Sequence, residues 1–150
     1  LKAYDFGHHF SCVVPEYNLG AEYRLDYLLI GKNSLGYQFV FVEFEDVNVE
    51  YKLKTENSES NKVRKGLSQI RDWKRWINQN INYFLNADGI KEFSSNVFPW
   101  GFRYALVVGR RDNMDETSNQ LRGELQREVD VTIMSYDRLV DYVALLHNGI

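Results

Sequence analysis

The pattern of apolar and polar residues predicts an antiparallel strand pair near the start of the chain. Residues 21–31 and 36–45 are rich in aromatic and β-branched side chains, and they flank a turn-prone segment at 32–35. This pattern is typical of a β-hairpin. Residues 1–20 mix histidine, proline and glycine without a sustained period, so we assign no element to them.

After the hairpin the pattern changes to helical periodicity. Apolar residues recur every three or four positions from Val63 to Phe84, which predicts a long amphipathic helix over residues 61–85. The polar stretch before it, 46–61, is interpreted as an exposed loop. A compact apolar run at 102–109 is typical of a strand that is buried on both faces.

The rest of the chain completes an α/β pattern. We expect a charged helix over 115–128, a short strand over 131–134 and a final helix over 136–147. The order ββαβαβα predicts a mixed β-sheet flanked by helices, the α/β class. With 150 residues and 44% hydrophobic content, residues 1–150 have the size of a single domain. Because the sequence starts at Leu1 instead of Met, we interpret it as a fragment of a longer chain.

Composition argues against several classes of protein. The single cysteine, Cys12, cannot form an internal disulfide, and no cysteine and histidine spacing typical of a zinc site occurs. His8 and His9 have no acid nearby at a ligand spacing, so they are interpreted as surface residues. No apolar run approaches the roughly 20 residues that span a bilayer. We therefore expect a cytoplasmic protein without a membrane partner.

The net charge of −3 is distributed unevenly. Residues 52–75 carry eight basic and three acidic side chains, a net charge of +5, which leaves −8 for the remainder. A basic element beside an acidic one suits a phosphate-binding surface next to a metal site. A solvated helix face with mixed charges explains the same pattern. On the first interpretation, the candidates for DNA contact are Lys52, Lys54, Lys62, Arg64 and Lys65.

Three carboxylates are the strongest candidates for chemistry. Glu43 and Glu45 are two residues apart in a strand, so the pleat turns both toward one face and Phe44 toward the other. Two like charges at the end of an apolar strand are costly unless a cation lies near them. Asp26 lies in an apolar stretch of the preceding strand and comes opposite this region in a hairpin. Such an oxygen-lined group suits Mg²⁺, although pairing with a nearby Arg or Lys is the alternative.

These residues resemble the PD-(D/E)xK nuclease superfamily, which places an Asp on one strand and a (D/E)-x-K on the next. Asp26 and Glu43 match the two acids. Gln69, in SQIRDW, is similar to the glutamine that many members carry on the following helix. The resemblance implies a restriction-endonuclease-like fold. An ordinary solvent-facing amide is the other interpretation of Gln69.

A narrower resemblance covers most of residues 20–145. The segments LDYLLIG, FVFVEFE, LSQIRDW, ALVVGRR and TIMSYDRLVDYV are similar to the nuclease domain of Shedu-type antiphage defence proteins. This resemblance implies cleavage or nicking of double-stranded DNA, a divalent metal, and action within a homo-oligomer that defends a bacterium.

One position departs from the superfamily pattern, because Glu45 stands where the motif lysine is usual. Some restriction endonucleases that resemble this pattern use Glu-x-Glu and remain active. Alternatively, a lysine from another element replaces it, with Lys52, Lys54 and Lys62 as candidates. In a third interpretation the site is degraded and the domain binds without cutting.

Our first hypothesis is a DNA endonuclease that depends on Mg²⁺ or Mn²⁺. Asp26 and Glu43 bind the metal together with the Phe44 carbonyl, and Glu45 positions or deprotonates the attacking water, or acts on a second metal. Gln69 orients the substrate or the Glu43 carboxylate. The alternative hypothesis is a catalytically degraded nuclease-like domain that holds DNA or a protein partner.

Other conspicuous residues have less specific interpretations. Arg110 and Arg111 follow a buried strand, where they contact phosphate or cap the strand end. Trp73, Trp76 and Trp100 are able to stack on bases. The helical spacing of Trp73 favours packing in the core.

Overall fold

A five-stranded mixed sheet is the centre of the fold. The computed structural model describes residues 9–95, 97 and 101–147. The strand order is β1-β4-β5-β6-β7; neighbours from β1 to β5 are antiparallel, and β6 and β7 continue from β5 in parallel. The predicted α/β class with a mixed sheet is confirmed. The strands are β1 (His9–Pro15), β4 (Tyr27–Asn33), β5 (Gly36–Phe44), β6 (Phe102–Val107) and β7 (Thr132–Met134).

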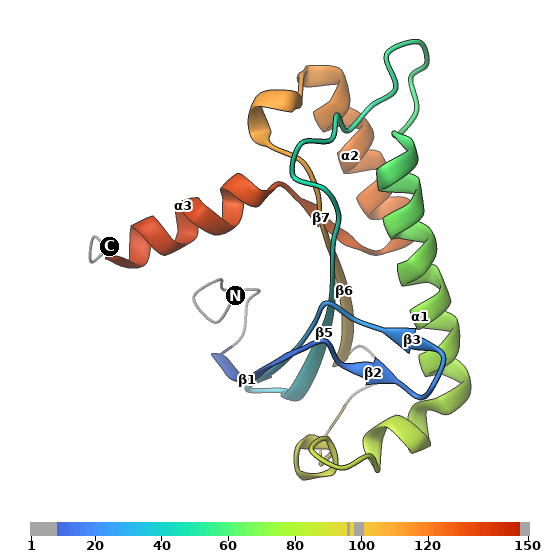
Figure 1. The fold of residues 1–150 in the computed structure, drawn as a ribbon. Coiled ribbons are helices and arrows are strands. Elements are labelled where there is room, and N and C mark those ends of the chain that lie inside the picture. Colours follow the sequence, from blue (N-terminus) through green and yellow to red (C-terminus); the bar gives the residue numbers. More distant parts are fainter. Residues whose placement is uncertain (1–8, 96, 98–100, 148–150) are drawn as a thin grey trace.

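Helices cover both faces of this sheet. α1 (Asn61–Leu85) and α2 (Glu116–Val129) pack on one face, and α3 (Tyr136–His147) begins on the other and extends away from it (Figure 1). The smaller elements are a hairpin of β2 (Asn18–Leu19) and β3 (Tyr23–Arg24) and the short helices η1 (Lys91–Phe93) and η3 (Arg111–Asn113). Among the described residues, no helix has the length and apolar character to cross a membrane.

The apolar pattern explains why β5 lies at the centre of the sheet. On the α1 face, Phe39 and Phe41 pack against Phe84, with ring centroids 5.2 and 5.6 Å apart. On the opposite face, Val40 and Val42 join a second buried cluster, against which Tyr136 and Leu139 at the start of α3 pack. Fully burying such side chains contributes about 1.5–3 kcal/mol each, so both faces of β5 need a cover. The predicted hairpin of β4 and β5 and the bounds of α1 are confirmed.

The first part of the chain differs from the prediction. Residues 9–15, to which no element was assigned, form β1 and pair with β4 along the sheet edge. The predicted strand 21–31 is interrupted, because β3 ends at Arg24 and β4 begins at Tyr27. Asp26 therefore lies at the bend that precedes β4. The apolar pattern continues through this bend because Leu25 is fully buried, and burial alone does not report a change in backbone direction.

The polar stretch between β5 and α1 is more ordered than a free loop. Tyr51 is 1% exposed and anchors the stretch in the core. Its carbonyl accepts a hydrogen bond from the Ser60 amide at 2.7 Å, and Lys52 forms an isolated bridge with Glu59. The basic residues of this stretch are thereby held close to the N-terminus of α1.

Candidate active site

The carboxyl end of β5 carries two buried carboxylates on the side of α1. Glu43 and Glu45 are each 6% exposed. Phe44 points to the opposite side, where its ring lies 5.6 Å from Tyr27 and 5.5 Å from Tyr136 between centroids. The alternation of β5 therefore brings both glutamates to one face, as their spacing predicts.

Asp26 joins this group from the bend before β4. The register places Tyr27 opposite Val42, so Asp26 comes beside Glu43. One carboxylate oxygen, Oδ2, accepts a hydrogen bond from the Phe44 amide at 2.7 Å. Asp26 thus ties the end of β5 to β4 and adds a negative charge next to Glu43.

The Glu43 carboxyl is the most strongly perturbed acid of the group. Burial, followed by the charges of Asp26 and Glu45, raises its pKa from 4.5 to about 7. The charge of Lys65 and a hydrogen bond from the Gln69 side chain act in the opposite direction. The site consequently holds an acid that titrates near neutral pH, a property common at functional sites.

Helix α1 supplies the two groups that face these acids. Lys65 Nζ lies 3.6 Å from Glu45 Oε1, while the Gln69 amide reaches Glu43. The two side chains are four residues apart and so project from the same side of the helix. Our candidates for a lysine from another element were Lys52, Lys54 and Lys62, but the lysine beside Glu45 is Lys65. Its spacing from Gln69 was a signal in the sequence that we did not use.

Gly66 explains how α1 approaches so closely. A Cβ atom at this position would lie 2.6 Å from Leu106 Cδ1 and 3.1 Å from Glu45 Cγ. Glycine inside a helix costs roughly 0.5–1 kcal/mol relative to alanine, so its presence needs a packing reason. That reason is the contact of the second helical turn with the ends of β5 and β6.

The oxygen atoms of the site fit a hard divalent cation. Glu45 Oε1 and Gln69 Oε1 are buried without a hydrogen-bond partner among the described residues. Buried oxygens of this kind call for an explanation such as a bound ion. Carboxylate and carbonyl oxygens are the ligands that Mg²⁺ and Mn²⁺ prefer. In the described part of the chain, no three His, Cys, Asp or Glu side chains are grouped closely enough to hold a metal, so a cation at this site would need oxygen ligands other than carboxylates as well.

Tyr136 is a neighbour of the site that the sequence analysis missed. Its hydroxyl donates a hydrogen bond to the Glu45 carbonyl at 2.6 Å. Burial and the nearby charge of Asp26 raise the pKa of this phenol to about 12, so it stays a proton donor. Ninety-one positions separate Tyr136 from Glu45 in the chain, and no local spacing reveals such a contact.

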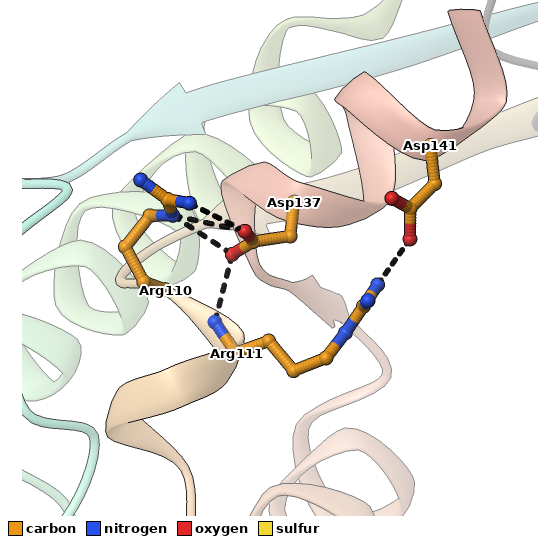
Figure 2. Close-up of polar contacts among 4 residues, drawn as sticks. All are labelled: Arg110, Arg111, Asp137 and Asp141. Atoms are coloured by element: carbon orange, nitrogen blue, oxygen red, sulfur yellow. Dashed lines mark hydrogen bonds and ion pairs between the residues drawn. The ribbon is translucent and has the colours of Figure 1, made fainter. Parts of the chain in front are cut away.

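Close to Tyr136, ion pairs join the start of α3 to the two arginines that follow β6 (Figure 2). The Arg110 side chain donates to both oxygens of Asp137 at 2.8–3.0 Å, and the Arg111 amide donates to the same carboxylate at 2.7 Å. The Arg111 guanidinium pairs with Asp141. We call these four residues the α3 clamp. Both arginines lie shortly after β6, and each binds a carboxylate of α3.

The predicted DNA-contact residues lie on a surface of mixed charge. Three of the five already have acidic neighbours: Lys54 is 3.6 Å from Glu50, Arg64 is 3.3 Å from Glu59, and Lys65 pairs with Glu45. Lys62 is exposed at the start of α1, and Lys52 is partly exposed. Trp73 and Trp76 are buried in the core, whereas His8 and Trp100 lie outside the described residues.

Comparison with known proteins places this geometry in context. Residues 3–140 match the family model described as Shedu protein SduA, C-terminal. The matched range runs from β1 to the first turn of α3 and includes all four acidic and amide side chains of the site. A comparison with curated proteins finds no match.

Proposed function

Because the chain belongs to the Shedu SduA C-terminal domain family, a family of antiphage defence nuclease domains, we propose that it is a metal-dependent DNA endonuclease. Its substrate in this proposal is double-stranded DNA, which it cleaves or nicks. The observation that carries the proposal is the buried pair Glu43 and Glu45 with Asp26 beside it. Such a pair destabilises the fold unless a cation offsets its charge.

The donor atoms suggest a division of roles. Asp26, Glu43 and the Phe44 carbonyl would hold Mg²⁺ or Mn²⁺, with Glu45 next to them. A bound cation offsets charge on the phosphate and lowers the pKa of a water ligand. Glu45 would position the attacking water or take its proton, and Gln69 would keep the Glu43 carboxylate oriented through its hydrogen bond.

Binding of DNA would use the surface around the N-terminus of α1. Its basic residues are Lys52, Lys54, Lys62, Arg64 and Lys65. The ion pairs of Lys54 and Arg64 are solvent-exposed and worth about 0–1 kcal/mol, so exchange for DNA phosphates costs little. The family likeness also supports action in the bacterial cytoplasm as a homo-oligomer.

Plasmid nicking tests this function directly. Wild-type protein with Mg²⁺ or Mn²⁺ should convert supercoiled plasmid to nicked or linear DNA, and a chelator should abolish the reaction. Glu43→Ala should be inactive. Glu124→Ala, which removes an exposed carboxylate on α2, is the matched control and should cut normally. Equal cleavage by the wild type and Glu43→Ala would exclude the assigned site.

A binding module that does not cut is the second candidate. Glu45 in place of the usual motif lysine favours it. The expected result is then no cleavage with any divalent ion, together with DNA binding that survives a chelator and weakens steeply with salt. An interaction that is insensitive to salt would point to a protein partner.

A further inference from the structure

We propose that Lys65 is a catalytic residue of this site: it neutralises Glu45 before the metal binds and then contacts the phosphate of the substrate. This inference rests on the proposed nuclease function. Lys65 lies in the second turn of α1, between the buried acids and the solvent. Nothing in the strand motif itself provides a cation at this point.

The position of Lys65 joins a buried charge to an open surface. Its side chain is 63% exposed, whereas the side chain of its partner Glu45 is 6% exposed. A DNA phosphate approaching from solvent would therefore meet the ammonium group before it reaches the carboxylates. Long lysine side chains commonly pack their methylene groups against the protein and keep the ammonium group at the surface.

The ion pair between Lys65 and Glu45 is long enough for Lys65 to exchange Glu45 for a phosphate oxygen. At 3.6 Å, Nζ and Oε1 form an ion pair that is longer than the 2.7–2.9 Å typical of a charged hydrogen bond. Glu45 Oε1 accordingly has no hydrogen-bond partner among the described residues, although it is buried. The ion pair thus offsets charge without satisfying the carboxylate, which remains able to take a metal ion or a water molecule.

The helix position of Lys65 is fixed by its neighbours. Gly66 packs directly on Leu106 and Glu45, so the backbone beside Lys65 lies close to the acidic group. One turn later, Gln69 reaches Glu43. The helix therefore presents one group to each glutamate. Among the described lysines, the ion pairs of Lys54, Lys74 and Lys91 are with Glu50, Asp130 and Asp88, all outside this acidic group.

The chemistry assigned to Lys65 is charge stabilisation. In hydrolysis, the oxygen of water bonds to phosphorus, the bond from phosphorus to one ester oxygen breaks, and the leaving oxygen takes a proton from solvent water. The proton released by the attacking water goes to a carboxylate, for which Glu45 is placed. Lys65 exchanges Glu45 for a non-bridging phosphate oxygen and donates a hydrogen bond to it. It remains an ammonium group throughout, and the charge that develops on the phosphate is offset.

The test combines cleavage with Mn²⁺ binding. In Lys65→Met, cleavage at saturating DNA should fall by roughly 100-fold or more, since a group that stabilises the transition state is lost. Mn²⁺ affinity, measured by calorimetry without DNA, should rise roughly tenfold because a competing cation has left the site. Lys91→Met removes the same charge from an exposed position in η1, outside the site and the proposed DNA surface, and should leave both values nearly unchanged. Lys65→Arg keeps the charge and should retain part of the activity.

The outcomes separate this inference from the proposed function. If Lys65→Met cuts at the wild-type rate while Glu43→Ala is inactive, the role of Lys65 is wrong and the nuclease function stands. If the wild type does not cut, the nuclease function fails and the catalytic role of Lys65 fails with it. Mn²⁺ affinity that is unchanged or weaker in Lys65→Met would also overturn the inference, because Lys65 would then be a structural partner of Glu45.

Discussion

Glu43 and Asp137 are both shielded from solvent, yet their surroundings are opposite. The Asp137 side chain, 17% exposed, accepts hydrogen bonds from Arg110 and from the Arg111 amide, which hold its pKa well below its usual range. Glu43 is more deeply buried and faces Asp26 and Glu45, so its pKa rises to about 7. One carboxylate is stabilised by its neighbours, and the other is destabilised by them.

This difference separates a structural region from the proposed functional one. The α3 clamp consists of complementary charges that favour the folded state. The acidic end of β5 instead concentrates like charge where burial makes it costly, and proteins tolerate such costs mainly at functional sites. The two regions meet at Tyr136, which precedes Asp137 and donates to the Glu45 carbonyl. Mutations in the two regions should therefore change stability with opposite signs.

The largest effect is expected from Glu43→Gln. Cleavage should fall by roughly 100-fold or more, and the increase in melting temperature caused by Mn²⁺ should disappear. The metal-free protein should become more stable at pH 8, because a destabilised charge is gone. Asp137→Asn should do the reverse, lowering the melting temperature while Mn²⁺ still raises it. Plasmid cleavage and thermal unfolding, each with and without Mn²⁺, test both variants. A lower melting temperature of metal-free Glu43→Gln would contradict the view that Glu43 is destabilised by its neighbours.

The stability of the metal-free protein should depend on pH through Glu43. The folded state binds this proton with a pKa of about 7 and the unfolded state with a pKa near 4.5, so the folded state holds more protons between these values. Stability should therefore fall by about 1 to 3 kcal/mol as pH rises from 4.5 past 7. Asp137 acts oppositely, since its contribution is lost as pH falls below about 3.8.

Denaturant unfolding at a series of pH values checks this prediction. Glu43→Gln should flatten the curve between pH 4.5 and 7 and leave the loss at acidic pH unchanged. Saturating Mn²⁺ should also flatten it, because metal binding favours the deprotonated carboxylate. A stability that rises across this range in the wild type would show that Glu43 is not the acid with the raised pKa.

A smaller effect is expected where α1 packs on the site. Gly66→Ala should lower the free energy of unfolding by about 1–2 kcal/mol, since the new methyl group overlaps Leu106 and Glu45. Gly123→Ala is the matched control inside α2, where no atom lies within 4 Å of the added Cβ. It should stabilise the protein by about 0.5–1 kcal/mol through helix propensity. Equal effects of the two substitutions in urea denaturation would argue against the close contact.

The smallest effect is expected at the link between the two regions. Tyr136→Phe removes the hydroxyl that donates to the Glu45 carbonyl and keeps the ring on Phe44. The free energy of unfolding should fall by about 1 kcal/mol, the usual net value of one hydrogen bond. Mn²⁺ affinity should change modestly, because the Glu45 backbone is less firmly held. Tyr83→Phe, at an exposed position of α1, serves as the control and should be neutral.

The sequence by itself determined the elements whose signal is local. The period of α1, the apolar run of β6 and the hairpin turn before β5 each predict their element, because the burial of one face repeats along the chain. The pleat likewise determined that Glu43 and Glu45 share a face. The bend at Asp26 and the strand β1 were not predictable in this way, since the apolar stretch continues through the bend and the edge position of β1 depends on pairing with β4.

Tertiary structure decided what surrounds the acids. Lys65 belongs to a basic stretch with several equivalent lysines, and only the packing of Gly66 on Leu106 and Glu45 selects it as the neighbour of the site. Tyr136 reaches Glu45 across ninety-one positions of the chain, and the α3 clamp holds the start of its helix. Residue order determines which charged side chains are present. Because electrostatic energies depend on distance and burial in three dimensions, only the fold determines which charges are stabilised by neighbours and which are left for a ligand.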